Sequence, residues 1–135
     1  MTAASTPAPF RIVKEPRAWW PVTWDGVAED GAAVANRIEL RFRLLKVDAA
    51  AQFVRAVVDA QAKELEAGAD LPGMYAGLVA TIADDWRHVA AENGEALPWT
   101  PENLRLLMNE GGMFRAIFAA WRACLAGERE HREGN

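Results

Sequence analysis

The residues whose types and spacing come nearest to a metal-binding pattern lie between positions 84 and 92. His88 follows Asp84 and Asp85 by four and three residues, and Glu92 lies four residues further on. On a helix this spacing would place the imidazole and the carboxylates along one face. A catalytic metal needs about three protein ligands in firm geometry, and the second histidine, His131, lies in a charged terminal run. We therefore expect a solvated helix face and no metal site.

Side chains that could act as nucleophiles are scarce. Ser5 is the only serine and Cys124 the only cysteine. Cys124 falls on an expected apolar helix stripe, where a thiol is a packing group because reactivity requires exposure and an electropositive setting. The pair Gly111-Gly112 follows an expected helix rather than a strand and matches no phosphate-binding motif. We therefore expect no catalytic residues, no cofactor and no enzymatic activity.

Composition indicates a single globular domain. The chain has 135 residues, of which 51% are hydrophobic and 25% charged, and its net charge is −4. The charge is about +2 over residues 1–47 and −6 over residues 48–135, which argues against a nucleic-acid partner. No apolar run approaches the twenty residues of a membrane span. The single cysteine and the lack of a secretory signal pattern predict a cytoplasmic protein.

The clearest strand is expected over residues 36–47. Apolar residues alternate there with charged ones, so the arginines share one face of a sheet and the apolar set the other. Two shorter strands are expected at 10–14 and 18–24, and Pro21 places the latter at an edge or a bulge. The arginine face could bind a folded partner, although a solvated sheet face is the simpler interpretation. The residues of this alternative partner face are Arg37, Arg41 and Arg43.

Helical periodicity begins at Asp48, an expected N-cap. The pair Thr100-Pro101 is typical of a helix start. The fold class expected is α+β: a mostly antiparallel sheet of about three strands packed against three to four helices. Trp86 and Phe118 are expected in the core. The expected helices are residues 48–67, 71–92, 100–108 and 113–127. We expect one domain over residues 10–127, with the sheet in 10–47 and the helices in 48–127. A flexible N-terminal tail (1–9) and a charged C-terminal tail (128–135) are expected on either side of it.

Six tryptophans are many for a chain of this length. Trp19 lies on the strand face opposite Trp20, and Trp99 lies in an expected loop. Either could be exposed as a protein-binding surface, since tryptophan is enriched at interface hot spots. For Trp99, folding back onto the core is the competing interpretation.

The order of these segments resembles the small tail assembly chaperones encoded by long-tailed bacteriophages and prophages. The resemblance covers about residues 10–125. It rests on a strand followed by helices, a tryptophan-containing segment, a loop, a Thr-Pro helix start and a final helix rich in alanine and aromatic residues. The segments are NRIELRFRLL (36–45), DW (85–86), NGEALPW (93–99), TPENLRLL (100–107) and AIFAAW (116–121).

The resemblance implies a non-enzymatic protein that binds the tape-measure protein, keeps it soluble while tail-tube subunits polymerise around it, and is absent from the finished virion. Homo-oligomerisation is compatible with this role. Apolar grooves and a charged surface suit such a role, since aromatic and methionine side chains adapt to varied apolar ligands. The alternative is a small adaptor that uses the arginine face. The residues expected to line a client groove between the helices are Tyr75, Leu78, Trp99, Leu104, Met108, Met113 and Phe114.

Overall fold

The computed structural model describes residues 7–127. Strands β1 (Arg17–Val27) and β2 (Ala33–Arg43) form an antiparallel pair. The alternation seen in the sequence sets their register: Trp20 lies opposite Leu40 and Val22 opposite Ile38, and all four side chains are buried. The arginines of β2 therefore lie on the other face of the sheet, as the period of two requires.

The third strand comes from a segment expected to be helical. Helix α2 (Leu71–Ile82) ends ten residues early, and β3 (Ala83–Arg87) pairs with β2, which makes β2 the central strand. Arg41 faces Asp85 while Phe42 faces Ala83, so Asp84 is the extra residue of a β-bulge. The bulge lets Ala83 and Trp86 both reach the core, and sheet pairing overrides the helical periodicity of this segment.

Residues 10–14, expected to form a strand, lie outside the sheet. This segment is exposed, with Phe10 91% accessible. It is tied to the body where Lys46 Nζ donates to the Val13 carbonyl at 2.6 Å and Leu44 N–H donates to Pro16 O at 2.9 Å. Because β3 occupies the third place in the sheet, the expected strand at 10–14 is wrong. Residues 1–6 of the expected tail, and the whole of 128–135, lie outside the described residues.

The remaining helices are α1 (Val47–Lys63), α3 (Pro101–Met108) and α4 (Met113–Ala126). Thr100 caps α3 as expected, accepting a hydrogen bond from Asn103 N–H at 3.1 Å. The expected Asp48 cap is wrong: Lys46 occupies the N-cap of α1 without a side-chain bond, and Asp48 lies in the first turn. There its carboxylate still interacts favourably with the partial positive charge of the helix N-terminus.

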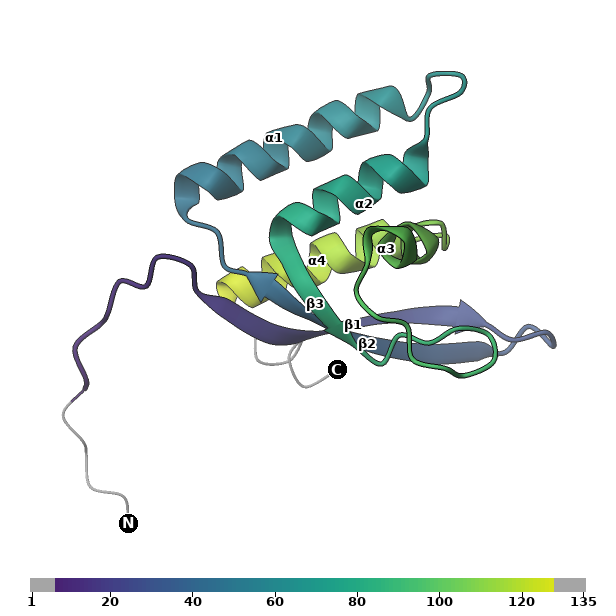
Figure 1. Ribbon diagram of the computed structural model, residues 1–135, viewed down its shortest axis with the longest axis horizontal. Coiled ribbons are helices and arrows are strands. Elements are labelled where there is room, and N and C mark those ends of the chain that lie inside the picture. The colour runs from purple at the N-terminus through teal and green to yellow at the C-terminus, as the bar shows by residue number, and fades with distance from the viewer. Residues whose placement is uncertain (1–6, 128–135) are drawn as a thin grey trace, which may run out of the picture.

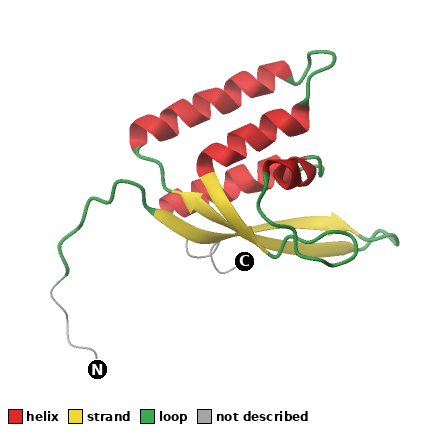
Figure 2. Ribbon diagram, viewed as in Figure 1, coloured by secondary structure: helices red, strands yellow, loops and turns green. Residues whose placement is uncertain are grey.

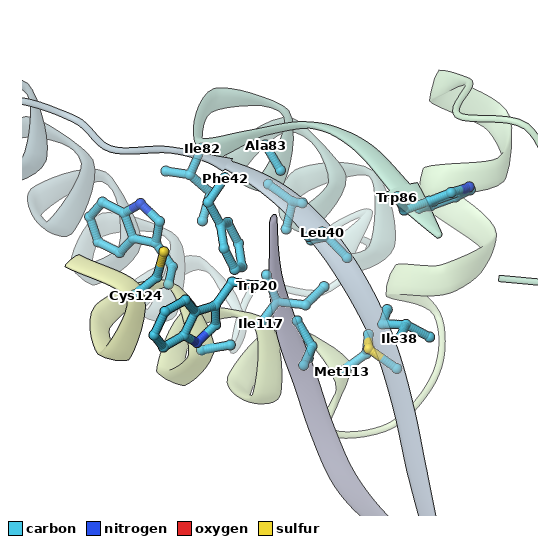
Figure 3. Close-up of a cluster of buried hydrophobic side chains, with 14 of the residues drawn as sticks. Trp20, Ile38, Leu40, Phe42, Ile82, Ala83, Trp86, Met113, Ile117 and Cys124 are labelled. Carbon is cyan, nitrogen blue, oxygen red and sulfur yellow. The ribbon is translucent and has the colours of Figure 1, made fainter. Parts of the chain in front are cut away.

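The helices cover one face of the sheet (Figures 1 and 2). Helix α4 lies against β1, and α1 packs on α2 at the greatest distance from the sheet (Figure 1). The core lies between sheet and helices, where Leu40, Phe42 and Ile117 are fully buried (Figure 3). The molecule is thus a small α+β fold, as the sequence predicts. Within residues 7–127, each helix is too short or too polar to cross a bilayer.

Candidate functional site

Four of the seven residues expected to bind a client meet in one hollow. We call it the client hollow; its volume is about 680 Å³. It lies where the end of α1, the start of α2 and the α3–α4 connection gather at one end of the helical layer (Figure 1). Its lining includes Tyr75, Met108, Met113 and Phe114.

Aromatic rings form one wall of the client hollow. Tyr75 stacks on Phe114 with ring centroids 4.6 Å apart, and Phe114 stacks on Phe118 at 6.0 Å. All three rings are half-buried, so each still offers part of its surface. Met108 and Met113, by contrast, are only 5% and 2% exposed. The methionines therefore belong to the core beneath the hollow, and the rings form its accessible apolar surface.

Phe118 was expected in the core, but it is half-buried and lines the client hollow. Its position four residues after Phe114 places the two rings on one face of α4, which is the sequence signal that could have included it. The rim of the hollow is polar, with Glu64, Glu110 and Arg115. Sequence reasoning missed this rim because it comes from three separate segments.

Trp99 and Leu104 line a different, smaller hollow of about 270 Å³ between α2 and α3. Trp99 is half-buried and packs edge-on against Trp86, with ring centroids 5.0 Å apart, so it folds back on the core. Across this region Arg105 binds Asp70 at 2.7 Å, and that hydrogen bond lowers the pKa of the Asp70 carboxyl. Leu78 lines neither hollow and packs half-buried against the core. The seven expected residues thus do not form a single groove.

The arginines of the alternative partner face are engaged within the chain. Arg41 Nε lies 2.6 Å from Asp84, and this hydrogen bond raises the pKa of the guanidinium. Arg37 pairs with Glu39 at 3.3 Å. Arg43 donates to the Ala80 carbonyl at 3.1 Å at the C-terminal end of α2, where a cation is favourable. Arg41 and Arg43 therefore have structural roles, whereas Arg37 makes only an exposed ion pair with a residue of the same strand.

Trp19 lies on the same face as these arginines and is half-buried. The Arg87 guanidinium sits 3.7 Å from its ring centroid, a cation–π contact. Arg41 lies over the same ring at 5.9 Å. The ring that could have been a free stacking surface is thus partly covered by the chain's own arginines.

Asp84 links all three strands, because it also binds Arg17 at 2.6 Å while its side chain is 15% exposed. We expect Asp84→Asn to lower the melting temperature more than Asp85→Asn, since Asp85 makes no ion pair within residues 7–127. The difference between the two variants should shrink in high salt, which screens half-exposed pairs. Thermal unfolding at low and high ionic strength measures both effects. Equal losses for the two variants would contradict this role of Asp84.

The expected carboxylate–imidazole row does not form on a helix. Asp84 and Asp85 belong to β3, while His88 follows it with a left-handed φ of 68°. His88 borders a third hollow, of about 590 Å³, beside the part of β2 that does not pair with β3. Among residues 7–127, no cluster of three His, Cys, Asp or Glu side chains could hold a metal ion.

Cys124 lies in the core, as its position on the apolar stripe predicts. Burial raises the pKa of its thiol to about 11. The thiolate is therefore a minor species at neutral pH, and the thiol is a packing group.

No protein-family model, curated protein or solved structure matches this chain.

Proposed function

We propose that the chain is a phage tail assembly chaperone that binds apolar helical stretches of the tape-measure protein. It acts without catalysis in the bacterial cytoplasm, assists polymerisation of the tail-tube protein and is absent from the mature virion. The structural observation that carries the proposal is the client hollow with its half-buried stack of Tyr75, Phe114 and Phe118. The resemblance of residues 10–125 supplies the identity of the client.

The form of the client hollow suits an apolar helix. A helix presents side chains three and four residues apart on one face, and stacked aromatic rings offer a continuous apolar surface that such a face can cover. The rim carries Glu64 and Glu110 but also Arg115, so acidic groups outnumber basic ones there and a client with basic residues beside its apolar stripe is favoured. A surface that is partly apolar and partly charged can bind many different client sequences. A chaperone of a long helical protein requires this tolerance.

The alternative of an adaptor working through the arginine face is less well supported. Arg41 and Arg43 already bind Asp84 and the end of α2. A partner would have to compete with these contacts, at the expense of the chain's own packing.

Co-expression with a tape-measure fragment tests the proposal. We expect Tyr75→Ser combined with Phe114→Ser to reduce the soluble fraction of the fragment at least fivefold, because the accessible apolar wall is lost. Val27→Ser is the matched control, since Val27 is 78% exposed and lies at the far end of β1. Circular dichroism verifies that each variant folds.

Two further variants separate the competing surfaces. Trp99→Ala should leave the fragment soluble if binding is confined to the client hollow. Arg37→Glu should also leave the soluble fraction of the fragment unchanged. Loss of solubility on Arg37→Glu, with an unchanged result for the double serine variant, would overturn the proposal and favour the adaptor.

A further inference from the structure

Strand β2 has a free edge over part of its length. Strand β3 pairs with it only from Glu39 to Phe42, so within residues 7–127 no strand lies beside residues 33–38 on that side. After β3 the chain turns at His88, whose φ of 68° is left-handed. The edge of β2 is therefore uncovered where β3, had it been longer, would have continued.

The backbone groups of Ala33, Ala35 and Arg37 point outward from this free edge. In an antiparallel pair, residues that exchange hydrogen bonds alternate with residues that do not. The Ala28 N–H donates to Ala32 O at 2.8 Å, so the even-numbered residues of β2 bond to β1. The odd-numbered ones face the other way, and within residues 7–127 the backbone of Ala35 and Arg37 has no backbone partner. Such an edge accepts an extended chain as a further strand.

The hollow of about 590 Å³ lies beside this free edge, and we call it the edge hollow. Trp24, Asn36 and Ile38 line it on the side of the sheet. Leu106 of α3, which is 58% exposed, lines it on the side of the helices. Alternate side chains of an added strand would point into the edge hollow. The edge therefore suits an extended segment with an apolar residue at every second position.

The N-terminal arm, residues 7–16, contains a segment of this kind. Phe10 and Ile12 flank the polar Arg11, and their side chains are 91% and 83% exposed. The alternation predicts a strand, yet within residues 7–127 the arm joins no strand of its own chain. The arm is thus a strand-forming segment whose apolar side chains are uncovered.

The unpaired charges of the arm and of the edge hollow are opposite in sign. Asp25 and Glu110 border the edge hollow, whereas Arg11 and Lys14 belong to the arm. Among residues 7–127, none of these four side chains makes an ion pair. Asp25 lies opposite Ala35 in the sheet. Because strands lie about 4.8 Å apart, an arginine on the added strand can reach Asp25 across the small side chain of Ala35.

The arm cannot reach the edge hollow of its own chain. The Leu44 N–H donates to Pro16 O at 2.9 Å, and Ala35 lies nine residues before Leu44 in β2. At about 3.3 Å per residue this separation is about 30 Å, whereas Ile12 lies at most about 14 Å from Pro16. Figure 1 shows the arm leaving the body at the end of the sheet opposite to the β1–β2 turn. Only another copy can therefore bring this arm to the free edge.

We propose that the N-terminal arm of one copy adds as a strand to the free edge of β2 in a second copy, with Phe10 and Ile12 in the edge hollow. Backbone hydrogen bonds hold the strand, and the hollow accepts its side chains. Each copy has one arm and one free edge, so two copies that exchange arms satisfy both and form a closed dimer. The inference does not rest on the proposed function, because the free edge and the aromatic wall of the client hollow are separate surfaces.

Complementation between two variants tests the proposal by sedimentation velocity. Phe10→Ser with Ile12→Ser disables the arm, and Ala35→Pro disables the edge, because it removes an outward N–H and leaves the bonds to β1 in place. We expect each variant alone to associate at least about tenfold more weakly than the wild type. An equimolar mixture should associate more strongly than either variant, because the intact arm of one fits the intact edge of the other. It should associate less strongly than the wild type, since one contact forms in place of two.

Val47→Ser is the matched control for the arm variant. Val47 is 88% exposed on α1, so this variant should associate like the wild type. Circular dichroism verifies that Ala35→Pro folds, and the arm variant, which changes only exposed side chains, tests the proposal by itself. A wild-type chain that stays monomeric at about 200 μM would overturn the proposal. So would an arm variant that associates as strongly as the wild type, or a mixture of folded variants that associates no better than its components.

Discussion

Replacing Trp121 by alanine should lower the free energy of unfolding by about 3–5 kcal/mol, the usual cost of a cavity left by a buried aromatic ring. Trp121 is only 1% exposed. Its ring packs against Phe53 at 4.9 Å, and its indole N–H donates to the Arg43 carbonyl at 3.1 Å. The side chain therefore joins α4 to α1 and to the end of β2, so its loss weakens contacts on both sides of the core.

Chemical denaturation measures this effect, and two variants separate its causes. Trp121→Phe keeps most of the ring volume but loses the hydrogen bond, so its cost should be nearer 1–2 kcal/mol. Leu125→Ala is the control on the same helix, because Leu125 is exposed and its loss should cost less than about 1 kcal/mol. A loss below 1 kcal/mol for Trp121→Ala would show that the ring is not part of the core.

The second large effect is expected at Trp86. Trp86→Ala should also cost about 3–5 kcal/mol, because the ring is 6% exposed and lies opposite Leu40 on the core face of the sheet. Its indole N–H donates to the Leu97 carbonyl at 2.7 Å, and Trp99 packs against its ring. Trp86 thus anchors the loop between β3 and α3 to the sheet as well as filling the core.

Two readouts distinguish these roles of Trp86. Urea denaturation reports the loss of global stability. Hydrogen exchange reports the loop, where the Leu97 amide, bonded to Val89 O at 2.9 Å, should lose protection beyond the global change. Trp99→Ala, which removes a half-buried ring, should cost clearly less than Trp86→Ala. An equal cost for the two variants would contradict the larger contribution assigned to Trp86.

The fold class and most elements could be predicted because their signals are local. The alternation in β2 has a single register that buries its apolar residues and leaves its arginines outside. The Thr100 cap and the left-handed Gly127 mark helix ends through short-range chemistry. Each of these features depends on residues a few positions apart.

Strand β3, which was expected to be part of a helix, shows the limit of prediction from local signals. Residues 83–87 have an apolar spacing that also fits a helix, and their partners are at least about forty residues away in the chain. The contacts of Asp84 with Arg17 and Arg41, and the pairing of Trp86 with Leu40, are long-range. The free energy of these contacts outweighs a local helical preference of less than about 1 kcal/mol per residue.

The candidate site, too, could be predicted only in part. Tyr75, Met108, Met113 and Phe114 were predicted together and lie in one hollow, whereas Trp99 and Leu104 lie in another. Residue type and helical face could be read from the sequence. Which faces meet depends on how α2, α3 and α4 cross, and that is set by packing over the sheet.

By itself, the sequence determined which residues are apolar, which face of each element they share and where most helices begin and end, because these properties arise from neighbours within one or two turns. Only the tertiary structure decided that β3 joins the sheet, that the arginines of β2 bind carboxylates and a helix end, and that helix α1 leaves Val47 and Val58 exposed. Those outcomes depend on contacts between segments that are distant in the sequence, and the energies of such contacts cannot be predicted from a local pattern.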